Sequence, residues 1–410
     1  MTSRERIIET LNHREPDVLA IDFGGMRSTG IHAIGYSRLV EYLKLDLPPA
    51  RLYDVFQQLA EPQMEVVNLL GGDVAQAHQR CPAFGIPIDG GWKEIELAEG
   101  VRVLAPLGYA PVYEADGSAS IYVGGVKTAR KPSASLYFDQ VVHPYQGCQS
   151  EADVDKVSIA PWSEAEIAFI EEGCRNLYEK TDKAILVPFG GNIFEAGQMD
   201  FGYEEFFVNL LLEPDMMHYY FNRITDIYME NLKNLLPRIA RYCQVLQFGD
   251  DLGTQEAPQI ARETYRQMIM PYHARQYQWV RNHYPSVRVF LHSCGAIAPL
   301  IPDLIDAGVE VLNPVQLSAR GMDPATLKRE YGKSLSFWGG GANTSQTVTY
   351  GTPAEIRRQS EALIEIFAPG GGYVFNQVHN FQPNVPPENI LAVYGAAHDY
   401  RRRQRGVSNG

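Results

Sequence analysis

The sequence predicts an α/β protein, a (β/α)8 TIM barrel, and two observations support this fold. Short apolar runs rich in β-branched residues alternate with longer amphipathic segments, which is the order expected when helices connect parallel strands. Polar and glycine-rich residues follow most of these runs, at the position where barrel enzymes carry their active sites. With 410 residues and no Ser/Gly/Pro-rich linker, we expect a single barrel domain spanning 1–410.

Seven short runs are expected to form strands, at residues 18–23, 185–188, 245–248, 287–291, 309–312, 335–338 and 373–378. Longer amphipathic segments are expected to form helices, for example 203–212, 216–239, 258–283 and 353–367. Residues 92–139 break the alternation, because short runs such as 120–123 are separated there by Gly and Asp turns. This region predicts a small antiparallel β insertion, which either flanks the barrel mouth or supports a homodimer contact.

Composition narrows the class of function. A formal net charge of -13 argues against nucleic acid as a partner, because such binding depends on basic residues that contact phosphates. No stretch is long and apolar enough to span a membrane, and the charged start does not resemble a secretory signal. Five scattered cysteines do not form a disulfide framework, so we expect a cytoplasmic enzyme.

The segment Phe290-Leu291-His292-Ser293-Cys294-Gly295 contains a His-x-Cys pair at the end of an apolar run. Side chains two positions apart on a strand point to the same side, so His292 and Cys294 are expected to face one point. Together with His379 they make three ligands, the number that a catalytic zinc usually takes from protein. The alternative is a buried thiol beside a hydrogen-bonded imidazole, without metal.

Other polar residues follow the expected strands. Asp250 and Asp251 are candidate catalytic groups, as a fourth ligand, as a partner that orients a ligating His, or as a proton acceptor. One of them is equally suited to cap a helix. Arg27 is expected to bind an anionic group of the substrate, or to form an ion pair with Asp22 or a loop acid. Further candidates for hydrogen bonds to substrate, or to loop backbone, are Glu195, Gln255, Asn313, Gln316, Asn376 and Gln377.

Several of these segments carry a resemblance to a known family. The segments are Ser3-Arg4-Glu5-Arg6-Ile7, Glu15-Pro16-Asp17, Ile21-Asp22-Phe23-Gly24-Gly25, Gly249-Asp250-Asp251-Leu252-Gly253, His292-Ser293-Cys294-Gly295 and Val385-Pro386-Pro387-Glu388-Asn389-Ile390. In these residues the sequence resembles the uroporphyrinogen decarboxylase superfamily over nearly its whole length. The resemblance implies a β/α barrel, in agreement with the alternation of runs and helices.

The resemblance implies one of two chemistries. The decarboxylases of this superfamily act on a tetrapyrrole without metal and use an N-terminal Arg-x-x-x-Arg motif, where this chain has the single Arg27. Its zinc-dependent methyltransferases exchange a methyl group with a corrinoid protein and use a His-x-Cys motif with a later Cys. His292 and Cys294 match that motif, and His379 stands where the later Cys is expected.

The resemblance to the methyltransferases therefore implies zinc, a corrinoid carried by a partner protein, and a small methyl donor or acceptor such as an ether, alcohol, amine or thiol. Imidazole in place of a thiolate makes the site less negative and the zinc a stronger Lewis acid, which suits an ether or alcohol oxygen. An O-demethylase component is one such enzyme. The alternatives are a metal-free decarboxylase-like lyase and a non-catalytic corrinoid-binding protein.

Overall fold

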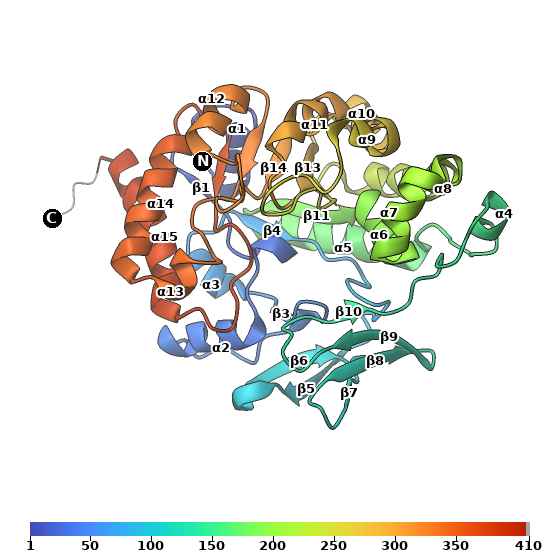
Figure 1. The fold of residues 1–410 in the computed structure, drawn as a ribbon. Helices are drawn as coiled ribbons and strands as arrows, with labels where there is room; N and C mark the ends of the chain where they lie inside the picture. The colour runs from blue at the N-terminus through green and yellow to red at the C-terminus, as the bar shows by residue number, and fades with distance from the viewer. Residues whose placement is uncertain (407–410) are drawn as a thin grey trace.

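The computed structural model describes residues 1–406, and its centre is an eight-stranded parallel sheet rolled into a barrel (Figure 1). The strands follow the spatial order β1-β16-β15-β14-β13-β12-β11-β4. Their bounds are β1 (Ala20–Ile21), β4 (Val74–Gln76), β11 (Ala184–Gly190), β12 (Val245–Gly249), β13 (Arg288–His292), β14 (Val311–Asn313), β15 (Ser336–Trp338) and β16 (Tyr373–Phe375). Every neighbouring pair is parallel, which confirms the predicted (β/α)8 TIM barrel.

Apolar side chains fill the inside of the barrel. Each strand contributes to one buried cluster, with Ala20, Val74, Ala184, Leu186, Val245, Phe290, Val311, Trp338 and Val374. Helix α1 (Ser3–Leu11) adds Ile7 and Leu11 to this cluster and contacts strands β1, β4, β11 and β16. Because α1 closes one end of a packed barrel, the polar residues that follow the strands gather at the other, carboxyl-terminal end.

Helices connect the strands and cover the outside of the barrel (Figure 1). Their bounds are α2 (Ala33–Tyr42), α3 (Met64–Leu69), α4 (Glu151–Val154), α5 (Glu164–Lys180), α6 (Phe194–Phe201), α7 (Tyr203–Leu212), α8 (Pro214–Ile239), α9 (Arg262–Thr264), α10 (Met270–His283), α11 (Ile301–Ala307), α12 (Pro324–Tyr331), α13 (Thr347–Tyr350), α14 (Pro353–Phe367) and α15 (Pro387–Gln404). Short turns are η1 (Arg27–Thr29), η2 (Ala98–Gly100), the π-helical η3 (Tyr265–Ile269) and η4 (Ala298–Leu300). Side-chain caps begin several helices, as Thr352 and Glu355 do in the capping box of α14.

The region 92–139 forms antiparallel sheets beside the barrel, as the sequence predicts (Figure 1). Its strands are β5 (Trp92–Glu96), β6 (Arg102–Pro106), β7 (Val112–Tyr113), β8 (Ala119–Val123), β9 (Val126–Lys131) and β10 (Asp139–Gln140). Strands β5 and β6 form a two-stranded sheet, with one bridge from Leu104 of β6 to Arg51, and β7 to β10 form a four-stranded sheet. A further hairpin, β2 (Leu52–Asp54) with β3 (Leu59–Ala60), precedes them in the chain.

Two parts of the barrel differ from the sequence prediction. Strand β4 was not predicted, because its three residues follow two glycines and give no clear periodic pattern. The helix expected over 258–283 begins only at Arg262 and contains the π-helical turn η3. Gln259 explains the late start, since its N–H donates to the carbonyl oxygen of Leu252 at 2.8 Å and its side-chain Nε2 to that of Asp251 at 2.8 Å. These bonds hold the preceding residues as a loop at the barrel mouth.

Two further observations concern the described residues. None of their helices combines the length and the apolar character that a membrane crossing requires. A cavity of about 400 Å³ opens beside Leu11, Arg288 and Glu310, at the barrel end that α1 closes. Barrel enzymes carry their active sites at the opposite end, so this cavity is not a candidate active site.

Asp73 joins the two strands at which the sheet order ends, β1 and β4. Its N–H donates to the carbonyl oxygen of Ile21 at 2.7 Å, and its Oδ2 accepts from the N–H of Ile21 at 2.9 Å. Arg6 and Arg401 pair with the same carboxylate, at 2.6 and 2.5 Å. All three side chains are largely buried, so this ion-paired carboxylate holds the barrel closed.

We predict that Asp73→Ala lowers the free energy of unfolding by about 3 kcal/mol, because it removes the common partner of two buried guanidinium groups. Urea unfolding followed by circular dichroism measures the change. Glu94→Ala is the matched control, because its ion pair with Arg102 is exposed and is expected to contribute less than about 1 kcal/mol. Equal unfolding midpoints for the two variants would contradict a closing role for Asp73.

Candidate metal centre

Strand β13 and the turn after it place His292 and Cys294 together. His292 is the last residue of β13, and Cys294 follows two positions later. Gly295 then has a φ of +95°, and a Cβ there would lie 2.3 Å from the backbone of Gly253. Only glycine fits this close approach between the loops that follow β12 and β13. The turn leaves Sγ of Cys294 3.5 Å from Nε2 of His292.

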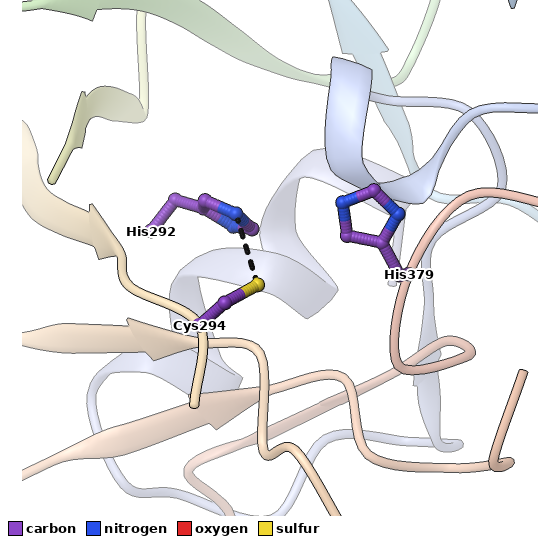
Figure 2. Close-up of side chains that lie close together, drawn as sticks. All are labelled: His292, Cys294 and His379. Carbon is purple, nitrogen blue, oxygen red and sulfur yellow. Dashed lines mark hydrogen bonds between the residues drawn. The ribbon is translucent and has the colours of Figure 1, made fainter. Parts of the chain in front are cut away.

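His379 completes the group from the loop that follows β16. One ligand atom from each of His292, Cys294 and His379 can be chosen so that all lie within 4.8 Å of one another. Figure 2 shows the thiol and the two imidazoles pointing toward a common centre. The structure therefore brings together the three residues predicted as metal ligands, all of them half-buried.

The protonation of His292 follows from the side chain of Asn313. Nδ2 of Asn313 donates to the carbonyl oxygen of Trp338 at 2.7 Å, which identifies Oδ1 as the acceptor. Oδ1 lies 2.6 Å from Nδ1 of His292, so Nδ1 carries the proton. Nε2 then presents a lone pair toward Cys294. Asn313, predicted to bind substrate, instead contacts a candidate ligand and fixes its tautomer.

Asn380 has the same role for His379. Its Nδ2 donates to Oε1 of Gln57 at 2.7 Å, and its Oδ1 lies 3.1 Å from Nδ1 of His379. The hydroxyl of Tyr137 donates to the same Oδ1 at 3.2 Å. Tyr137 lies at the end of the β insertion, so the insertion extends to the candidate metal centre.

Burial shifts the pKa of two of the three side chains, His379 and Cys294. It lowers the pKa of His379 to about 4, with a smaller effect from nearby His292, so that this imidazole is neutral at pH 7. Burial also raises the pKa of the Cys294 thiol well above its usual value, and the carboxylates of Asp251 and Glu195 raise it further. A cation between these groups would favour the thiolate, since a metal ion removes the proton of a coordinating thiol.

The two neighbouring carboxylates after β12 have different environments. Asp250 is 0% exposed, and it accepts from the N–H groups of Ile193, Phe194 and Glu195 at 2.6 to 3.0 Å. Nε2 of His273 lies 2.8 Å from its Oδ2. Asp250 thus caps helix α6 from another strand end, and a catalytic role for it remains only a prediction.

Asp251 points the other way, and its side chain is 36% exposed. Its Oδ1 accepts from the N–H of Cys294 at 2.7 Å and lies 3.7 Å from Nε2 of His292. Nearby Glu195 accepts from Nδ2 of Asn192 at 2.7 Å. Burial, then the charges of Asp251 and Asp250, raise the pKa of Glu195 to about 8. At neutral pH Glu195 is therefore mostly protonated beside the charged Asp251.

The spacing of Cys294 and His292 and the types of the three donors suit a tetrahedral zinc ion. With a Zn–S bond of about 2.3 Å and a Zn–N bond of about 2.0 Å, sulfur and nitrogen ligands lie about 3.5 Å apart. The Sγ to Nε2 distance between Cys294 and His292 is 3.5 Å. Soft sulfur combined with two imidazoles also suits zinc better than calcium or magnesium, which prefer oxygen.

Comparison with known proteins places the chain in a family. Residues 140–400 match the family model described as "Uroporphyrinogen decarboxylase (URO-D)", which is more than half of the chain. The chain belongs to the uroporphyrinogen decarboxylase family. Residues 1–139 of this family member, with Arg27 and the β insertion, lie outside the matched part.

Curated relatives of this family member are distant. It is 25% identical to the uroporphyrinogen decarboxylase of Chlorobium limicola over 254 residues, 59% of this chain and 67% of that one. The uroporphyrinogen decarboxylase of Pelodictyon phaeoclathratiforme matches at 25% over 256 residues, with the same shares of both chains. A solved structure, "methyltransferase from Methanosarcina mazei", superposes with a TM-score of 0.62 at 14% identity, over 98% of this chain and 99% of that one. At that identity the superposition supports the barrel fold.

The remaining predicted residues of this family member have structural contacts. Arg27 pairs with Asp54, the last residue of β2, and not with Asp22, and its Nη2 donates to the carbonyl oxygen of Pro82 at 2.9 Å. The four amide side chains predicted to contact substrate have these partners: Gln255 accepts from Ser318, Gln316 from the N–H of Gly295, Asn376 donates to the Gln377 carbonyl, and Gln377 donates to the Thr29 carbonyl. Asn376 and Gln377 are fully buried, so their predicted contact with substrate lacks access.

Three residues near the centre were missed by the sequence prediction as site residues, namely Gln57, Tyr137 and Asn380. Gln57 and Tyr137 are 323 and 243 positions away from Asn380 in the chain. Only a prediction of the loop contacts themselves could have found them. Asn380 follows His379 directly, so its position beside a candidate ligand was the one available signal.

We predict about one zinc per chain in the wild-type protein, and its loss in Cys294→Ala and in His379→Ala, because three protein ligands are the usual set of a catalytic zinc. Elemental analysis of the purified proteins measures the metal content. Cys81→Ala is the matched control, since this half-buried cysteine is not part of the ligand group. Equal zinc in Cys294→Ala and wild type would refute the site.

We further predict that Asn313→Ala weakens zinc binding about 10- to 100-fold, because partners that orient a ligating His contribute that much to metal affinity. Competition with a chromophoric chelator gives the zinc dissociation constant. Gln255→Ala serves as control, because Gln255 is exposed and contacts none of the three ligands. An unchanged constant in a folded Asn313→Ala protein would show that the tautomer of His292 is not set by Asn313.

Proposed function

We propose that this protein is a zinc-dependent methyltransferase that moves a methyl group between a small substrate and the cobalt of a corrinoid protein. The observation that carries the proposal is the convergence of His292, Cys294 and His379 at the carboxyl end of the barrel strands. Family membership and the barrel of the Methanosarcina mazei methyltransferase agree with it. The methyl carrier would be an ether, alcohol, amine or thiol, as in an O-demethylase component.

The chain's own residues have defined tasks in this proposal. His292, Cys294 and His379 would hold a zinc ion, which would supply Lewis acidity to the heteroatom that bears the methyl group. Asn313 and Asn380 keep both Nδ1 protons turned away from the centre. In such a transfer the heteroatom would keep the electron pair of the broken bond, and the methyl group would pass to the cobalt(I) of the partner's corrinoid.

Glu195 is a candidate to supply a proton to the departing heteroatom. Burial and two neighbouring carboxylates raise its pKa to about 8, so that it retains its proton at neutral pH. Asp251 accepts from the N–H of Cys294 and lies 3.7 Å from Nε2 of His292, where a carboxylate would offset part of the charge of a bound metal. A general acid with a pKa near the working pH is well suited to this step.

A metal-free lyase of the decarboxylase type is the second candidate, because the curated relatives are named as uroporphyrinogen decarboxylases. It would use Arg27 to bind an acidic substrate. A single arginine offers less than the paired arginines of the decarboxylase motif. The ligand group around Cys294 would have no task in such a reaction.

We predict that the zinc-loaded protein transfers a methyl group in one of two assays. It either demethylates methylcobalamin in the presence of a thiol acceptor or methylates cob(I)alamin from a methyl donor. Cys294→Ala should reduce the rate at least about 100-fold, because it removes a metal ligand. The cobalamin absorption spectrum follows the reaction. Cys81→Ala should keep the wild-type rate. Release of carbon dioxide from uroporphyrinogen, unchanged by Cys294→Ala and by zinc removal, would instead establish the lyase.

A further inference from the structure

Arg27 has an unused hydrogen-bonding edge. Nε contacts the carboxylate of Asp54, and Nη2 donates to the carbonyl oxygen of Pro82 at 2.9 Å. Nη1 has no hydrogen-bond partner among residues 1–406. The side chain of Arg27 is 39% exposed, whereas that of Asp54 is 0% exposed. The ion pair therefore presents its cationic edge, and not the carboxylate, to the outside.

A group of three half-buried aromatic rings begins beside this guanidinium with Phe56. The guanidinium carbon of Arg27 lies 5.5 Å from the ring centre of Phe56. The ring of Phe84 meets that of Phe56 edge to face, with ring centres 5.7 Å apart. The ring centre of Tyr137 lies 6.3 Å from that of Phe56, and the two ring planes are inclined at 30°. Partly exposed aromatic side chains that gather around one charged group are typical of a binding site for small molecules.

This aromatic group is connected to the metal centre at both ends. Tyr137 donates its hydroxyl to Asn380, which holds His379. Ser28, next to Arg27 in the chain, donates its hydroxyl to Oδ1 of Asn313 at 3.1 Å, the atom that also holds His292. Tyr137 therefore contacts Asn380 directly, and Arg27 is the chain neighbour of the residue that contacts Asn313.

We propose that Arg27, Phe56, Phe84 and Tyr137 form the subsite for the methyl carrier, and that this carrier is a small aromatic anion. Its ring would contact the aromatic side chains, its carboxylate would bind Nη1 of Arg27, and its methyl-bearing heteroatom would face the metal centre. All four residues lie in the part of the chain that the family model does not match, so family membership does not decide this specificity.

The opposite charge class, a quaternary ammonium ion, is disfavoured by the position of Arg27. Aromatic rings attract such cations, but the face of Phe56 already has a guanidinium over it. A second cation beside Phe56 would be repelled. Glu195, whose raised pKa keeps it mostly protonated at neutral pH, adds little negative charge to offset this repulsion.

The inference rests on the proposed methyl transfer, and ligand binding tests it separately. Isothermal titration calorimetry of the zinc-loaded full chain compares 4-methoxybenzoate with anisole, cyclohexanecarboxylate and phenyltrimethylammonium. We expect 4-methoxybenzoate to bind about tenfold or more tightly than each of the others, because each of them lacks its carboxylate or its aromatic ring. Tightest binding of phenyltrimethylammonium, or equal binding of all four, would overturn the proposal.

Two variants test the charged part and the aromatic part of the subsite separately. Arg27→Met should weaken 4-methoxybenzoate about tenfold and leave anisole unchanged, with Arg102→Met as an exposed control. Because Arg27→Met leaves buried Asp54 without its partner, Phe84→Leu provides a second measurement that keeps this ion pair. Phe84→Leu should weaken 4-methoxybenzoate but not cyclohexanecarboxylate, and an unchanged preference in both variants would overturn the subsite.

Failure of the inference is distinguishable from failure of the proposed function. Methyl transfer that needs zinc and Cys294, together with no preference for 4-methoxybenzoate, would reject the aromatic anion and keep the methyltransferase. Selective binding of 4-methoxybenzoate that depends on Arg27, without any methyl transfer to cobalamin, would keep the subsite and reject the methyltransferase.

Discussion

The side-chain amide of Asn313 is the constraint on which the candidate centre depends. Its Nδ2 is held by the carbonyl oxygen of Trp338, so its Oδ1 can only accept, and it accepts from both His292 and Ser28. The parallel register makes this possible, because His292 and Asn313 are direct neighbours at the ends of β13 and β14. The ends of β13, β14 and β15 and the turn after β1 thus meet at Asn313. The orientation of the His292 imidazole therefore depends on the register of these neighbouring strands.

Asp250 and Asp251 show how neighbouring residues with the same side chain acquire different tasks. Burying a carboxylate is costly unless hydrogen bonds compensate it, and Asp250 has three backbone N–H groups and His273 as partners. It fixes the start of helix α6, and with it the position of Glu195. Asp251 retains access to solvent and lies beside the candidate ligands. One carboxylate therefore positions the acid Glu195, and the other sets its charge environment.

The sequence predicted the parts of this structure that repeat along the chain and missed those that depend on single long-range contacts. The apolar runs at 245–248 and 335–338 correspond to β12 and β15, because a buried parallel strand is nearly continuous in apolar residues. Strand β4 was missed because three residues show no period. The role of the β insertion was open, since the contact of Tyr137 with Asn380 spans 243 positions and leaves no local pattern.

The candidate ligands were predictable because the spacing of His292 and Cys294 is local, whereas the choice between two imidazole tautomers was not. In the structure both His292 and His379 have Nδ1 bonded to an asparagine oxygen, which directs both Nε2 lone pairs away from these partners and toward the common centre in Figure 2. A thiol can donate its one proton to only one of two such acceptors. Without a cation, at most one of the two lone pairs finds a donor within the group. A bound metal ion would satisfy both lone pairs and the sulfur at once. The polar contacts of Asn313 and Asn380 therefore prepare both imidazoles to bind a metal, as the proposed metal-dependent reaction requires.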